Sequence, residues 1–236
     1  MGKGGDIEMG LYPNMTESPQ MRWAFIRKVY SIVTLQILIT IAISAIVVFY
    51  RPIPDFFLSR TTSAIVALVF LSISPFLVMI PMIFLRDKHP WNMFLLGLFT
   101  ICFSMVIGLS CVTRSGKAIL EAAVLTAVVV GGLTMYTFWA AKRGHDFNFL
   151  GPFLSAALLV MMVYVLVQIF FPLGKIGTTI YGCVGAIVFA GFIIYDTDNL
   201  IKRHTYDEYV CAAIALYLDI VNLFVSIVTA LSAADA

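Results

Sequence analysis

Seven long runs of apolar residues alternate with short polar connectors along the chain. The runs extend over 29–50, 63–85, 92–113, 119–141, 148–171, 176–195 and 209–231. Each run holds 20 to 24 residues, and about 20 residues of helix are needed to cross roughly 30 Å of hydrocarbon. The pattern therefore predicts an all-α membrane protein with a bundle of seven transmembrane helices.

The connectors between these runs are short and hold the proline, glycine and charged residues. They leave no room for a second domain, so we expect one membrane domain over 29–232 after a flexible cytosolic segment, 1–28. The first apolar run begins near Val29, far from Met1, whereas a secretory signal places its apolar core close to the start. Insertion should therefore be directed by the first span itself.

Composition agrees with a lipid environment. Hydrophobic residues make up 61% of the chain and charged residues 12%, whereas a soluble domain is about half apolar and a quarter charged. The formal net charge of +2 gives no electrostatic case for nucleic acid as a partner. The four cysteines lie singly and have no metal-binding spacing.

Orientation follows from the lysines and arginines outside the spans, which are enriched on the cytosolic side of membrane proteins. Ten lie on the N-terminal side: Lys3, Arg22, Arg27, Lys28, Arg86, Lys88, Lys142, Arg143, Lys202 and Arg203. Five lie on the opposite side: Arg51, Arg60, Arg114, Lys117 and Lys175. This bias predicts a cytosolic N-terminus. Glycosylation of the sequon at Asn14 would reverse the assignment, because that modification is lumenal.

Three acidic residues, Glu121, Asp196 and Asp219, fall inside or at the edge of predicted spans. An aspartate near mid-membrane costs about 2.5–3.5 kcal/mol on insertion scales, so it needs a partner or a water-filled cavity. Asp196 ends the sixth apolar run, yet Leu200 and Ile201 continue the apolar pattern. A basic end at 202–204 follows, so we expect this helix to continue to about residue 204.

The turn between the last two helices is then expected near 205–208, midway between Asp196 and Asp219. Two antiparallel helices joined there would hold both aspartates at the same depth, roughly 17 Å from the turn. Spacing alone cannot fix the rotation of the helices. It therefore predicts a common depth and leaves contact between the carboxyl groups open.

Two carboxylates at one depth in a low dielectric cannot both ionise cheaply, so they should share a proton or hold a hard cation such as calcium. Neutralisation would keep the two helices together and full deprotonation would drive them apart, which is a pH-dependent latch. Asn199 and Asn222 follow each aspartate by three residues and could add oxygen atoms. The alternative is that the aspartates only tie the helices together by hydrogen bonds.

The remaining charged residues have simpler interpretations. Asp198 stands four residues before Lys202, the favourable order for an ion pair along a helix. Glu121 lies near the start of its helix, where it can interact with the helix dipole or attract ions. Arg86 closes the second span as a cytosolic interfacial residue.

Four segments together resemble the transmembrane Bax inhibitor motif family, and within it the plant Lifeguard branch. The segments are ILEAAVLTAV at 119–128, KRGHDFNFLGPFL at 142–154, IYDTDNLIK at 194–202 and LYLDIVNLF at 216–224. The resemblance covers about residues 25–232.

The resemblance implies a bundle in which the last helix is central. It also implies a calcium leak that lowers store calcium and suppresses programmed cell death from the endoplasmic reticulum, another endomembrane or the plasma membrane. The family's aspartate pair falls on Asp196 and Asp219, and its glutamate on Glu121. A basic residue opposite the pair matches Arg86, with Lys88 as a competitor. The chain ends without the basic cluster of some members.

Two other functions compete with a calcium leak. An intramembrane aspartyl protease would need a GxGD pattern, but Leu216 and Leu218 occupy the glycine positions, so we expect no enzymatic activity. A non-conducting regulator would instead suppress cell death by binding other membrane proteins, and the sequence leaves this alternative open. Membrane lipid is the expected surrounding in either case.

Overall fold

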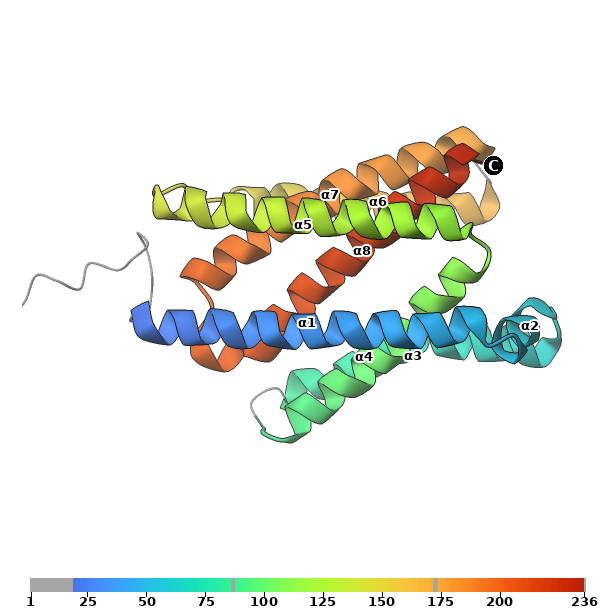
Figure 1. The fold of residues 1–236 in the computed structure, drawn as a ribbon, viewed down its shortest axis with the longest axis horizontal. Coiled ribbons are helices and arrows are strands. Elements are labelled where there is room, and N and C mark those ends of the chain that lie inside the picture. The colour runs from blue at the N-terminus through green and yellow to red at the C-terminus, as the bar shows by residue number, and fades with distance from the viewer. Residues whose placement is uncertain (1–18, 86–87, 172–173, 236) are drawn as a thin grey trace, which may run out of the picture. The chain divides into compact units, whose positions relative to one another are not determined.

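The computed structural model describes residues 19–85, 88–171 and 174–235, and this part of the chain contains helices and no strand. The elements are α1 (Pro19–Phe49), α2 (Pro52–Leu58), α3 (Thr62–Leu85), α4 (Trp91–Val112), α5 (Gly116–Lys142), α6 (Leu150–Phe170), α7 (Gly174–Lys202), the 3-10 turn η1 (Tyr206–Glu208) and α8 (Tyr209–Asp235) (Figure 1). Seven of the described helices are long and apolar enough to cross a membrane. The predicted all-α membrane fold is thereby confirmed.

Two helix boundaries differ from the simplest reading of hydropathy. The helix α7 passes the end of its apolar run and continues to Lys202, as the pattern of Leu200 and Ile201 predicted. The helix α1 begins at Pro19 rather than at Val29, so the predicted boundary at residue 28 falls inside a helix. The short helix α2 lies in a predicted connector and begins with proline, whose fixed φ suits the first turn.

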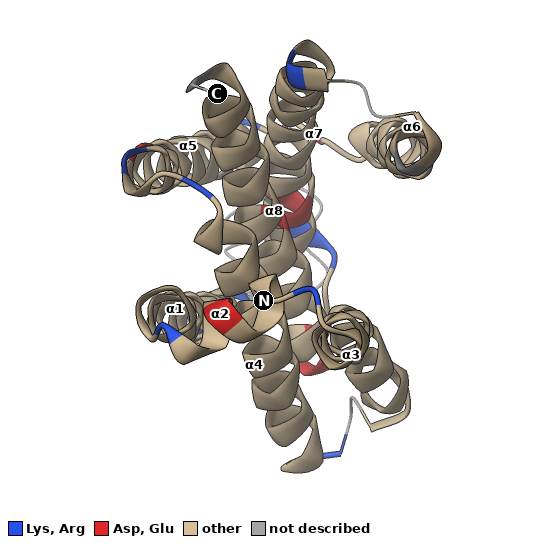
Figure 2. Ribbon diagram, turned by 90° about the vertical axis from the view of Figure 1, so that its right-hand side faces the viewer, with Lys and Arg blue, Asp and Glu red and all other residues tan. Residues whose placement is uncertain are grey.

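The membrane domain divides into two compact units. One unit, here the amino-terminal unit, holds residues 29–116, and the other, the carboxyl-terminal unit, holds residues up to 28 together with those from 117 onward. In the ribbon coloured by charge, lysine and arginine lie mostly near helix ends, and long stretches of each helix carry no charge (Figure 2). This distribution is the one expected of helices whose middle turns face lipid.

In the amino-terminal unit, buried polar side chains join α1 to α4. The amide nitrogen of Gln36 donates to the hydroxyl of Thr100 at 3.0 Å, and the hydroxyl of Ser104 lies 3.0 Å from that of Thr40. Gly108 lets the helices approach, because a Cβ there would lie 2.8 Å from the Cβ of Val47. Small residues and interhelical hydrogen bonds are the usual means of packing helices in lipid.

In the carboxyl-terminal unit, α7 and α8 pack closely and run in opposite directions (Figure 1). A Cβ on Gly182 would lie 2.6 Å from the backbone nitrogen of Ala230, so only glycine allows this separation. On its other side α8 contacts α5, where Val228 packs against Ala118 and Ala122. Within this unit the last helix therefore lies between α5 and α7, in keeping with the expected central position.

Candidate functional site

The turn between α7 and α8 lies where the spacing of the two aspartates predicted it. The helix α7 ends at Lys202, and the 3-10 turn η1 precedes the start of α8 at Tyr209. A capping box closes the turn, in which the backbone N–H of Thr205 donates to the carboxylate of Glu208 at 2.9 Å. This turn sets the register of α7 against α8 and hence the depths of Asp196 and Asp219.

The structure brings Asp196 and Asp219 into direct contact. Their side chains are hydrogen-bonded to each other, from α7 and α8 respectively. An ionised carboxylate has no proton to donate, so this bond requires that one of the two carries a proton. The rotation of the helices, which the sequence left open, therefore turns both carboxyl groups toward one another. We refer to Asp196 and Asp219 as the aspartate pair.

The two members of the aspartate pair have different surroundings. Asp219 is buried, with 6% of its surface exposed, and Asp196 is half-buried. Among the described residues, the Oδ2 atom of Asp219 is buried and has no hydrogen-bond partner. A buried polar atom without a partner raises the free energy of an ionised state more than that of a neutral one.

Asn199 lies against the aspartate pair, as its position three residues after Asp196 predicted. Its side chain is hydrogen-bonded to the carboxyl group of Asp196, and its Oδ1 atom accepts a hydrogen bond from Arg203 at 2.5 Å. Asn222 is half-buried on α8, and no hydrogen bond of its side chain is found within the described part of the chain. Of the two asparagines, Asn199 is the one that the structure joins to the pair.

At the end of α7, Asp198 and Lys202 form the predicted ion pair along the helix. The Nζ atom of Lys202 lies 2.5 Å from Oδ1 of Asp198, and both side chains are almost completely buried. Lys202 also donates to the carbonyl oxygen of His145, and the backbone N–H of Phe147 donates to Asp198 at 3.2 Å. The pair therefore holds the connector between α5 and α6, a function that its spacing alone did not reveal.

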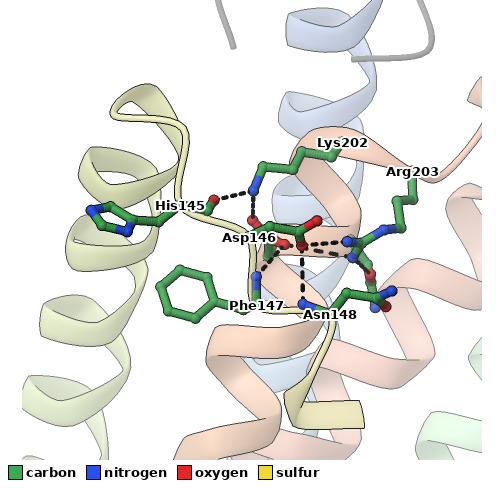
Figure 3. A network of polar contacts seen from close by, with 8 residues as sticks. His145, Asp146, Phe147, Asn148, Lys202 and Arg203 are labelled. Atoms are coloured by element: carbon green, nitrogen blue, oxygen red, sulfur yellow. Dashed lines mark hydrogen bonds and ion pairs between the residues drawn. The ribbon is translucent and has the colours of Figure 1, made fainter. Parts of the chain in front are cut away.

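Arg203 extends this network to the surface (Figure 3). Its guanidinium lies 2.5 Å from Oδ1 of Asp146 in the same connector and 3.5 Å from Oδ2 of Asp198. Burial alone would raise the pKa of Asp146. The hydrogen bonds from Arg203 and from the backbone N–H of Asn148, with the positive charge nearby, instead hold this pKa below its usual value. Asp146 is thus ionised near neutral pH and holds Arg203 in place.

Arg22 is a buried residue that the sequence analysis counted only as a cytosolic charge. It is 0% exposed, and its guanidinium donates to the carbonyl oxygens of Leu200 at 3.2 Å and His204 at 2.5 Å. These carbonyls belong to the last turn of α7, where helices leave carbonyls unpaired. The signal that could have identified Arg22 is the apolar face of Phe25 and Val29, which continues α1 toward the N-terminus.

The other candidate residues are not joined to the aspartate pair. Glu121 is exposed on α5, and its carboxylate lies 3.7 Å from Lys117 in an ion pair along the helix. This contact agrees with the simpler interpretation of Glu121. Arg86 lies outside the described residues, and Lys88 is exposed in the amino-terminal unit.

The donor set around the pair fits a proton better than a resident metal ion. No group of three or more histidine, cysteine, aspartate or glutamate side chains suited to a metal occurs among residues 19–85, 88–171 and 174–235. Calcium takes six to eight oxygen ligands, and two carboxyl groups with Asn199 supply fewer. A calcium ion passing this point would have to keep part of its water shell.

Comparison with known proteins places the chain among relatives of similar length. A family model described as "Inhibitor of apoptosis-promoting Bax1" matches residues 22–236. Protein LIFEGUARD 4 of Arabidopsis thaliana is 59% identical over 229 residues, covering 97% of this chain and 92% of that protein. Protein LIFEGUARD 2 of the same plant is 57% identical over 226 residues, with 96% and 94% covered. A Golgi anti-apoptotic protein of Vaccinia virus (strain Lister) is 36% identical over 218 residues, with 92% and 89% covered.

Proposed function

Because the chain belongs to the Bax inhibitor family, with Lifeguard proteins as relatives, we propose that it suppresses programmed cell death as a multi-pass membrane protein. The family model describes inhibitors of apoptosis-promoting Bax1, and the viral relative is named as anti-apoptotic. The resemblance that four sequence segments indicated is confirmed by these matches. The proposal for the mechanism is a pH-sensitive calcium leak that lowers the calcium content of an internal store.

The observation that supports a gate is the contact between Asp196 and Asp219 across the α7–α8 interface. With one proton shared, the pair carries a single negative charge and the hydrogen bond joins the helices. Loss of that proton places two like charges in contact, and their repulsion in a low dielectric favours separation of α7 from α8. The exposed negative charges would then attract a cation, which is the proposed cargo.

Glu121, Asn222 and Arg86 enter this proposal as neighbours of the path rather than of the pair. Glu121 is an exposed carboxylate at the start of α5, where it would raise the local concentration of cations. Asn222 could supply an oxygen atom once the pair has opened. Their substitution should change the rate of flux without moving its pH dependence.

We place the protein in an endomembrane, either the endoplasmic reticulum or another compartment, with the plasma membrane as a further site. The Golgi in the name of the viral relative supports an internal membrane. The excess of lysine and arginine on the N-terminal side of the spans supports a cytosolic N-terminus. In microsomes, Asn14 should then stay without glycan, and a glycosylated Asn14 would reverse the orientation.

The purified chain in calcium-loaded liposomes tests the leak directly. We expect calcium efflux that rises with pH, and a changed rate or pH dependence in Asp196→Asn and Asp219→Asn. Asp207→Asn is the matched control, because it removes an exposed carboxylate from the turn η1. Unchanged efflux in both pair variants would exclude the gate.

The second candidate function is a non-conducting regulator that binds other membrane proteins. In its favour, the family description and the name of the viral relative both concern apoptosis and name no ion. No efflux from the parent protein at any pH, together with protection of cells against a death stimulus, would favour this function over the leak.

A further inference from the structure

The orientation of the Asn199 amide is fixed by Arg203. A guanidinium only donates hydrogen bonds, so the amide atom that faces it must be the oxygen. Arg203 lies 2.5 Å from that oxygen, one helical turn after Asn199 on α7. The NH2 group of Asn199 is therefore the part left to meet Asp196, and its hydrogen bond to that carboxyl group is a donated one.

Arg203 is itself held from two sides. Asp146 in the α5–α6 connector lies 2.5 Å from one guanidinium nitrogen, and Asp198 lies 3.5 Å from another. Asp198 is in turn paired with Lys202. The polar contacts thus form a continuous chain from the connector through Arg203 and Asn199 to Asp196.

The donated hydrogen bond favours a negative charge on Asp196. A hydrogen bond to an ionised acceptor is stronger than one to a neutral acceptor, so the fixed amide stabilises the ionised form. Arg203 and His204, on the same face of α7, add positive or partly positive charge on this side.

Asp219 has the opposite surroundings. It is more deeply buried than Asp196, and its Oδ2 atom has no hydrogen-bond partner among the described residues. Within the carboxyl-terminal unit, the titratable group described in contact with it is Asp196. Arg22 from α1 donates to the carbonyls of Leu200 and His204 at the end of α7 instead. Both ends of the shared bond therefore favour a neutral Asp219 and an ionised Asp196.

We infer that Arg203, acting through Asn199, fixes the direction of the hydrogen bond in the aspartate pair, so that Asp219 holds the shared proton and donates it to Asp196. Arg203 and Asn199 are positioning residues in this arrangement. The inference concerns the same pair as the proposed leak and names the groups that set its pH response. It also connects the connector residue Asp146 to the gate.

Infrared absorption of protonated carboxyl groups in the purified protein tests the location of the proton without any measurement of flux. At neutral pH the parent protein should show a band from the shared proton. Asp219→Asn should remove this band and Asp196→Asn should keep it. The reverse pattern, or equal loss in both variants, would overturn the assignment.

A double-mutant cycle tests the route through Asn199. Arg203→Gln and Asn199→Leu should each move the pH at which the pair takes up its second proton to a higher value, by about one pH unit for one lost hydrogen bond. The double variant should show no further shift, because Arg203 then has no amide to orient. Additive shifts, or no shift in the single variants, would contradict the inference.

Arg143→Gln is the matched control, since it removes an arginine from the same end of the unit. Its guanidinium lies 4.1 Å from the ring centroid of Trp139 and belongs to no contact of this chain, so the midpoint should stay unchanged. Arg203→Lys retains a positive donor and should show an intermediate midpoint if Arg203→Gln fails to fold. Absent calcium efflux with the expected infrared pattern would reject the leak and leave this inference standing.

Discussion

The carboxyl group of Asp196 on α7 is hydrogen-bonded to that of Asp219 on α8, and this bond requires a shared proton. The close approach of the two helices at Gly182 and Gly185 permits no side chain larger than hydrogen at the interface. A buried pair of acids is thus set into a closely packed helix interface. Loss of its proton would act on packing that has little room to adjust.

Asp198→Asn should strongly destabilise the protein. It would leave the charge of Lys202 buried without its partner, and breaking a buried ion pair in this way costs about 3–5 kcal/mol. Thermal unfolding of the detergent-purified variant measures the loss. Lys117→Gln breaks the exposed pair with Glu121 along α5 and should cost less than about 1 kcal/mol.

Asp146→Asn should reduce stability in a pH-dependent way. Because the folded state holds the pKa of Asp146 below its unfolded value, its stabilising effect is present above the unfolded pKa of about 3.9 and is lost as pH falls through the folded one. The difference in melting temperature should be constant from about pH 7 to 5 and shrink below about pH 4. Asp146 is partly exposed, so the effect should stay below about 1 kcal/mol. A difference that grows with acidification would contradict this assignment.

Arg22→Leu should loosen the end of α7. The carbonyl oxygens of Leu200 and His204 would lose a charged donor in a buried place, a loss of about 1.5–3 kcal/mol for each such hydrogen bond. Hydrogen–deuterium exchange should accelerate in the turn 203–209 and stay unchanged at the start of α7. Arg27→Leu removes a more exposed arginine from α1 and should leave exchange in the turn as it is.

Gly182→Ala should destabilise the interface of α7 and α8. The new Cβ would lie 2.6 Å from the backbone nitrogen of Ala230, so the helices would have to separate, and overpacking of this kind costs about 1–3 kcal/mol. Gly131→Ala is the matched control on α5, since no atom lies within 4 Å of its Cβ position. That change should be neutral or stabilise the helix by up to about 1 kcal/mol. Equal melting temperatures for both variants would show that the close approach is not required.

Local features of this chain could be predicted because they depend on neighbours along the same helix. The apolar runs predicted the seven spans, and the continued pattern at Leu200 and Ile201 predicted the length of α7. The ion pair of Asp198 with Lys202 follows from the spacing of four residues on a helix. The common depth of Asp196 and Asp219 follows from the rise per residue and a short turn.

Features that join different helices could be decided only by the tertiary structure. Contact between Asp196 and Asp219 depends on the rotation of α7 against α8, which close packing at Gly182 sets. The burial of Arg22 and the pairing of Asp146 with Arg203 join residues far apart in sequence. The sequence by itself determined how deep each charge lies in the membrane, because depth is counted along one helix. Which charges meet was decided by side-chain packing between helices, since rotation about a helix axis leaves hydropathy and depth unchanged.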